Sequence, residues 1–149
     1  MRRALVILPV QLLVVLCVAA AASSPRVVVL GKKNLLNNGA GWGTAEPTTV
    51  YNGGDPSGHA FHLRWTAWGS ASAYAQGLNW IFKPQGGYYQ KPGEIELRAY
   101  RIGQCVAGGP HAYTRLQARV AARPGGPLGK WFAWGGWRTI CTWPSFLKH

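Results

Sequence analysis

Two carboxylates, Glu94 and Glu96, are the residues whose type and spacing come closest to catalytic chemistry. Glycoside hydrolases use such a pair when the acids lie about 5–9 Å apart across the sugar. Positions two apart on a strand share one face, so both side chains are expected to point outward together. Arg98, Arg115 and Arg119 are expected on the same strand or a neighbouring one. Solvated ion pairs are therefore the favoured interpretation, and hydrolysis is the alternative.

Histidine and cysteine offer two further kinds of chemistry, and neither pattern is complete. His59 and His62 are three positions apart, which on a strand directs them to opposite faces, and no third metal ligand follows nearby. Cys105 could act as a nucleophile beside His111 only if its thiol stayed free. The G-x-S-x-G motif of serine hydrolases is missing from the sequence. The sequence therefore predicts no catalytic residue, no metal ligand and no cofactor.

Arginine and tryptophan give a stronger signal than the acids. The chain has 16 Lys and Arg against four Asp and Glu, a formal net charge of +12, together with eight tryptophans. A positive field attracts polyanions and anionic surfaces. Exposed rings beside arginines suit sugar faces, nucleobases or lipid headgroups. A core of this size does not use eight tryptophans, so two to four of them are expected to be at least partly exposed.

A basic, partly aromatic stripe is the predicted binding site. Arg115 and Arg119 are expected on the outward side of a strand whose other side is apolar. Arg98 and Tyr100 extend the same face if the preceding strand runs antiparallel to it. Trp68 is expected on the outward face of a third strand. A solvated face whose charges only aid solubility is the alternative interpretation.

The N-terminus predicts export. Arg2 and Arg3 precede an apolar run over residues 4–18, and small residues follow at positions 20–22. The run is about 15 residues long, whereas a membrane-spanning helix needs about 20. Residues 1–22 are therefore expected to be a signal peptide and the mature protein to be secreted. An uncleaved membrane anchor is the alternative.

Two cysteines outside that segment, Cys105 and Cys141, are expected to form a disulfide. Cys17 would leave with the signal peptide, so only one pairing remains. The spacing fits neither a metal-binding nor a redox C-x-x-C pair. Closing a loop of this length stabilises a fold by about 3–4 kcal/mol in the chain-entropy model.

The remaining pattern predicts the elements that must position these residues. Residues 23–47 are expected to be a lead-in loop segment with a short strand at 27–30, and residues 48–149 a single β domain. Strands are predicted by alternation, and turns by glycine and proline. The candidate strands lie at 48–51, 59–68, 71–82, 94–102, 112–122 and 131–143. The predicted fold is all-β, a small antiparallel sandwich or barrel-like domain with one disulfide.

Two local patterns are specific enough to name residues. In the turn at residues 53–58, Gly53 or Gly54 is expected to take a positive φ, and Asp55 to cap the turn with its side chain. Over residues 59–68, alternation predicts Phe61, Leu63, Trp65 and Ala67 on one face and His62, Arg64, Thr66 and Trp68 on the other. On the strand at 112–122, Leu116, Ala118 and Val120 are expected inward and Tyr113, Arg115, Gln117 and Arg119 outward.

Three short motifs occur in order: Tyr51-x-Gly-Gly-Asp-Pro-Ser-Gly58, Trp65-x-x-Trp-Gly69 and Ala75-x-Gly77. With the later cysteine pair, they resemble a group of small secreted proteins of high-GC Gram-positive bacteria. The resemblance covers roughly residues 47–143. The group has no assigned activity, so the resemblance implies export and a β domain and no site residue.

The leading functional hypothesis is an exported, non-enzymatic β module that binds an anionic polymer, a glycan or a membrane surface. Export argues against a nucleic-acid partner. The alternatives are a small secreted hydrolase or enzyme inhibitor, and a structural extracellular protein without a ligand. A concave site that gathers Glu94 or Glu96 with a histidine favours the enzyme. A flat face with exposed rings and arginines favours binding.

Overall fold

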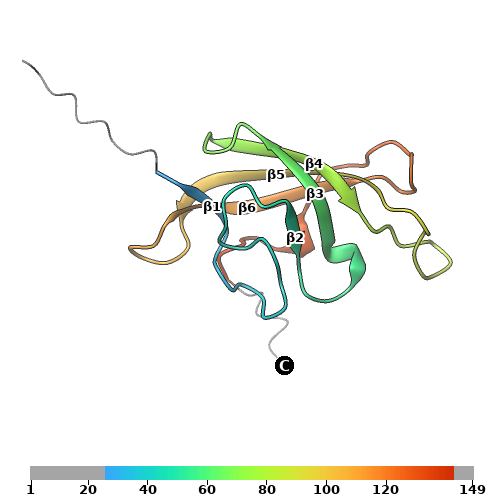
Figure 1. The fold of residues 1–149 in the computed structure, drawn as a ribbon, viewed down its shortest axis with the longest axis horizontal. Helices are drawn as coiled ribbons and strands as arrows, with labels where there is room; N and C mark the ends of the chain where they lie inside the picture. Colours follow the sequence, from blue (N-terminus) through green and yellow to red (C-terminus); the bar gives the residue numbers. More distant parts are fainter. Residues whose placement is uncertain (1–25, 143–149) are drawn as a thin grey trace, which may run out of the picture.

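The computed structural model describes residues 26–142, which form a seven-stranded sheet that curls into a half-barrel (Figure 1). The strands are β1 (Val28–Leu30), β2 (Thr49–Tyr51), β3 (His59–Thr66), β4 (Ser72–Asn79), β5 (Gly93–Gln104), β6 (His111–Val120) and β7 (Phe132–Ala133). Two 3-10 helices complete the elements, η1 (Pro56–Gly58) and η2 (Trp134–Gly136). The expected all-β, barrel-like fold with one disulfide is confirmed.

The strand order across the sheet is β1-β6-β5-β4-β3-β2, and β7 pairs with β6. Every pairing between named strands is antiparallel except that of β1 with β6, which is parallel and makes the sheet mixed. A parallel pair needs a long connection between its strands, and here most of the domain provides it. The expected signal peptide, residues 1–22, lies outside the described residues. Among residues 26–142, no helix is long and apolar enough to cross a membrane.

Small side chains line the inner face of the curled sheet. Alternation holds along β4, along β5 as far as Tyr100 and along most of β6, as predicted. Five inward alanines are at most 1% exposed: Ala60, Ala73, Ala75, Ala99 and Ala118. Alanine fills little volume, so larger groups from outside the sheet must occupy the concave side at the close packing that protein interiors require.

Two irregular segments supply those groups. Leu35, Leu36 and Trp42 enter the core from the loop between β1 and β2, and Trp134, Trp137 and Ile140 enter it from the C-terminal segment. The rings of Trp42 and Trp137 meet with their centroids 5.9 Å apart. The lead-in segment expected over residues 23–47 therefore packs, from β1 onward, as part of the core of the same domain.

The alternation predicted for residues 59–68 is wrong after its third residue. His62 has a φ of 53° at a shift of register between β3 and β4, so Ala60 and Leu63 both face the core although they are three positions apart. A β-bulge of this kind reverses the faces of all the following residues. Phe61 therefore does not share a face with Leu63.

A second left-handed residue ends β3 and turns Trp68 inward. Ala67 has a φ of 56°. The Trp68 ring packs on Trp65 and on Tyr113, with centroids 4.7 and 5.1 Å apart, and its Nε1 donates to the carbonyl of Val28 at 2.9 Å. Tyr113, expected to point outward, is fully buried, and its hydroxyl donates to the carbonyl of Ser70 at 2.7 Å. The outward orientation predicted for these two rings is therefore corrected.

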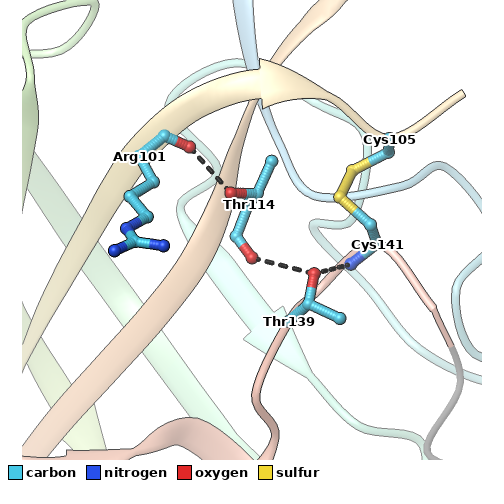
Figure 2. The surroundings of a disulfide bond; sticks show 5 residues. All are labelled: Arg101, Cys105, Thr114, Thr139 and Cys141. Atoms are coloured by element: carbon cyan, nitrogen blue, oxygen red, sulfur yellow. Dashed lines mark hydrogen bonds between the residues drawn. A yellow bond between two sulfur atoms is a disulfide. The ribbon is translucent and has the colours of Figure 1, made fainter. Parts of the chain in front are cut away.

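A disulfide fastens the C-terminal segment to the end of β5, and a set of hydrogen bonds fastens it to β6 (Figure 2). Cys105, just after β5, is bonded to Cys141, which confirms the predicted pairing. The Thr139 hydroxyl donates to the carbonyl of Thr114 at 3.1 Å and accepts from the backbone N–H of Cys141 at 3.2 Å. The N–H of Ile140 also donates to the Thr114 carbonyl, at 3.0 Å. Ile140 is thereby held in the core.

We expect removal of the disulfide to lower the free energy of unfolding by about 4 kcal/mol, because the bond closes a loop with a sequence separation of 36. Chemical denaturation of the Cys105→Ala/Cys141→Ala double variant measures this change. The wild type in reductant serves as the control and should unfold at the same denaturant concentration as the variant. An unchanged midpoint in both samples would contradict the stabilising role of this bond.

The turn before β3 provides the second test. Gly53 has a φ of 80°, and a Cβ placed there would lie 2.8 Å from the backbone carbon of Asn38, whereas nothing lies within 4 Å of a Cβ at Gly54. We expect Gly53→Ala to destabilise the fold by about 1–2 kcal/mol, since the left-handed conformation strains alanine. Gly54→Ala is the matched control and should unfold like the wild type in urea. Equal losses of stability in the two variants would contradict the role of the positive φ at Gly53.

Candidate functional site

A cation lies between two rings on the outer face of the sheet. Arg98 of β5 is half-buried, and its Cζ lies 5.0 Å from the ring centroid of Tyr100 and 5.9 Å from that of Tyr74 on β4. Its Nη2 donates to the hydroxyl of Ser72 at 3.5 Å, and its Nε is buried without a partner among the described residues. Antiparallel pairing explains the arrangement, because Tyr74 stands opposite Arg98 and Ser72 opposite Tyr100.

Three arginines surround a hollow of about 280 Å³ that begins beside Tyr100. We name this site the basic hollow, and it is lined by Tyr100, Arg101, Arg115, Leu116, Ala133, Trp137 and Arg138. Arg115 stands opposite Tyr100 in the pairing of β5 with β6, as the predicted antiparallel stripe requires. The residues that line this hollow include no carboxylate, so its positive charges are not compensated locally.

The sequence missed Arg101 for a physical reason. Alternation places residue 101 on the inward face of β5 with Ala99. In the structure Arg101 is exposed and has a φ of 58°, which breaks the alternation. Its carbonyl accepts a hydrogen bond from the Thr114 hydroxyl at 2.9 Å, and this bond holds the backbone there (Figure 2). A left-handed conformation in a residue other than glycine is strained, and such strain gathers at functional sites.

Arg138, the other missed arginine, enters the hollow from the C-terminal segment. It follows Trp137, whose ring is buried in the core. The sequence predicted a strand over residues 131–143, which is wrong beyond Ala133, where β7 ends and η2 begins. Only the packing of Trp137 brings Arg138 beside β6. Local sequence contains no signal for such a contact between distant segments.

Arg119 differs from the other predicted arginines because its charge is compensated. Its Nη2 lies 2.6 Å and its Nε 2.8 Å from Oε2 of Glu96, the one ion pair among residues 26–142. Its Cζ also lies 4.9 Å from the ring centroid of Trp131. The favoured sequence interpretation of Glu96 as an ion-pair partner is thereby supported, and Arg119 adds little free charge to the stripe.

The structure therefore brings together Arg98, Tyr100 and Arg115, ties Arg119 to Glu96, and separates Trp68 from them. Within residues 26–142, four tryptophans are half-buried: Trp65, Trp68, Trp80 and Trp131. The prediction of two to four applies to all eight tryptophans, and Trp143 lies outside the described residues. Of these four, Trp131 lies against the stripe through its contact with Arg119.

A second hollow, of about 460 Å³, gathers the two glutamates with a histidine, which is the arrangement that would favour an enzyme. Its lining includes His62, Arg64, Glu94 and Glu96. Glu96 is bound to Arg119 through Oε2, while its Oε1 accepts from Gln76 at 3.4 Å. Among the described residues, no group of three histidine, cysteine or acidic side chains could hold a metal ion.

Comparison of the chain with protein-family models, curated proteins and solved structures finds no match. The resemblance to small secreted bacterial proteins therefore stays a prediction. Function must be argued from the chemistry of the sites themselves.

The strain at Arg101 is testable without a ligand. We expect Arg101→Gly to leave the free energy of unfolding unchanged or to raise it by up to about 1 kcal/mol, because glycine adopts a positive φ at little cost. Arg98→Gly, three positions earlier in the same strand, is the matched control and should destabilise the fold by about 1 kcal/mol. Thermal or urea unfolding compares the two. Equal losses of stability would show that the backbone at Arg101 is unstrained.

Proposed function

We propose that this protein is exported and binds an anionic polymer or an anionic, glycan-rich surface outside the cell, without catalysing a reaction. The observation that supports this function best is the basic hollow, in which Arg101, Arg115 and Arg138 surround a cavity lined by no carboxylate. Such a group of like charges is costly unless a counter-charge binds between them.

Arginine suits this role better than lysine would. Its planar guanidinium presents several N–H donors in a fixed geometry that matches carboxylate, sulfate or phosphate groups. Arg98 extends the positive surface from the hollow along β5, between Tyr74 and Tyr100. Since two rings hold this side chain in place, it loses little conformational freedom when an anion binds.

The neighbouring aromatic groups extend the proposal to acidic glycans. Tyr74 is exposed, and Tyr100 lines the hollow beside the arginines. An acidic polysaccharide would place its anionic groups against the guanidinium groups and its sugar faces against these rings. The charged groups would supply most of the affinity, and stacking on the rings would orient the polysaccharide.

A secreted hydrolase is the second candidate, favoured by the hollow that gathers His62, Glu94 and Glu96. An acid and a base must both be free to exchange protons with the substrate. Of the two carboxylates that line this hollow, Glu96 already holds Arg119 through one oxygen, and Glu94 has no ion pair among the described residues. Binding through the basic hollow requires no free acid and base.

Dextran sulfate and neutral dextran provide a matched pair of probes for the proposed function. We expect the protein to bind dextran sulfate and not dextran. Binding should weaken at least about tenfold between about 50 and 300 mM salt, because bound counter-ions are released from the polyanion. The triple variant Arg101→Gly/Arg115→Gln/Arg138→Gln should weaken binding by about a further tenfold.

A second triple variant, which loses the same number of positive charges elsewhere on the surface, distinguishes binding at the basic hollow from attraction by the overall positive charge of the protein. Lys91, Arg123 and Lys130 are exposed and lie outside the lining of the basic hollow, so we expect their replacement by glutamine to weaken binding less than about threefold. Equal losses in the two triple variants would rule out the hollow as the site. If the protein does not bind dextran sulfate even at low salt, the proposed function is wrong and a structural protein without a ligand is favoured. Cleavage of either dextran that is lost in Glu94→Gln would favour the hydrolase.

A further inference from the structure

A larger cavity, of about 670 Å³, is lined in part by the hairpin that follows β4 and by the end of β6. These two segments lie at the end of the half-barrel opposite the connection between β5 and β6 (Figure 1). We name it the aromatic cleft. Its walls come from η1, the end of β4, the hairpin that follows β4, the end of β6 and the segment of β7 and η2. It shares no lining residue with the basic hollow. Its volume lies within the range of small-molecule sites.

Four aromatic rings line the cleft, and two of them are unusually exposed. Phe82 is 57% exposed and Phe132 45% exposed, and both line the cleft together with half-buried Trp80 and buried Trp134. Phe82 is held in place by an edge contact with Tyr88, whose ring centroid is 5.5 Å away. Large apolar rings that converge on one cavity while open to water are a common feature of ligand sites.

Two asparagines that line the cleft are held by hydrogen bonds that leave one polar group free on each. Oδ1 of Asn52 accepts from Nε1 of Trp134 at 2.8 Å, which leaves the Asn52 amide N–H groups as donors. Asn79 is only 3% exposed, and its Nδ2 donates to the carbonyls of Ser57 and His59 at 2.8 and 3.1 Å. Its Oδ1 accepts no hydrogen bond from the described residues and is left as an acceptor.

Asp55 adds a fixed carboxylate oxygen. Its Oδ1 accepts from the N–H and the hydroxyl of Ser57 and from the hydroxyl of Tyr88, so that Oδ2 has no hydrogen bond among the described residues. The hydrogen bond from the Ser57 side chain, followed by that from Tyr88, lowers the pKa of Asp55 below its ordinary value. The group is therefore an ionised acceptor at neutral pH. Lys83, which carries the opposite charge, lines the same cleft without an ion pair to Asp55.

We propose that the aromatic cleft binds a neutral carbohydrate segment. A sugar has apolar C–H faces, which pack on Phe82 and Phe132, and a rim of hydroxyls, which both donate and accept. The free donors of Asn52 and Lys83 and the free acceptors of Asp55 and Asn79 match that rim. An acyl chain would bury these four polar groups without partners. An anionic ligand would meet the Asp55 carboxylate.

Soluble hexasaccharides of glucose and of N-acetylglucosamine test this assignment: cellohexaose, maltohexaose and chitohexaose. We expect at least one to bind in calorimetry with a Kd below about 1 mM and to change the tryptophan fluorescence, because Trp80 and Trp134 line the cleft. The titrations are made in about 500 mM salt, which screens the basic hollow. Binding here is therefore independent of the dextran sulfate result.

Matched variants locate the binding. Phe82→Ala/Phe132→Ala should weaken it at least about tenfold, because two stacking rings are lost. Both rings are exposed, so unfolding of this variant is not expected, and its melting temperature verifies that it folds. The control Ile102→Ala/Val106→Ala removes two exposed apolar side chains that line neither the cleft nor the basic hollow, and it should bind like the wild type.

Three results would overturn the inference. Failure of all three hexasaccharides to bind at about 10 mM would exclude a carbohydrate site of useful affinity. Binding that the phenylalanine variant retains would place the sugar elsewhere. Binding of decanoate without binding of any hexasaccharide would assign the cleft to an acyl chain instead.

Discussion

The concave side of a sheet lined with alanine cannot be left empty, and the rest of this structure depends on how it is filled. Trp42, Trp134 and Trp137 come from two segments at opposite ends of the described chain, and together they occupy the interior of the half-barrel. If these three rings were absent, the side chains around the empty interior would lose their dispersion contacts. The two irregular segments are therefore as much a part of the core as the strands.

Filling the half-barrel from outside the sheet requires that the filling segments be fastened. The disulfide at Cys141 and the hydrogen bonds of Thr139 and Ile140 to Thr114 fasten the C-terminal segment (Figure 2). At the other end, β1 pairs with β6 and the N–H of Leu30 donates to the carbonyl of Thr44 at 2.8 Å. The hydrogen bonds to Thr114 and the pairing with β1 both involve β6, while the disulfide joins Cys141 to Cys105 just after β5.

The same packing positions the two candidate sites. Trp137 is buried in the core and lines the basic hollow, so the residue that follows it, Arg138, is carried to the side of Arg115. Trp134 fills the core at the other end, and its Nε1 orients Asn52 in the aromatic cleft. A charged site and a neutral site thus share one structural cause. A protein with both could hold an acidic polymer at one place and a neutral sugar segment at another.

Local periodicity and composition determined the strands from β1 to β6, the inward faces of β4 and of β5 up to Tyr100, the disulfide and the cap at Asp55, because each depends on neighbouring residues or on a single possible pairing. Only the tertiary structure decided on which face of the sheet the residues after His62, Ala67 and Arg101 lie. A positive φ at these positions shifts the alternation of inward and outward residues, whereas a prediction from sequence continues it unchanged. It also decided that Arg119 is compensated by Glu96, and that Arg101 and Arg138 are not compensated in the basic hollow. The sites were hidden for the same reason: their side chains come from segments that meet only because tryptophans fill the half-barrel.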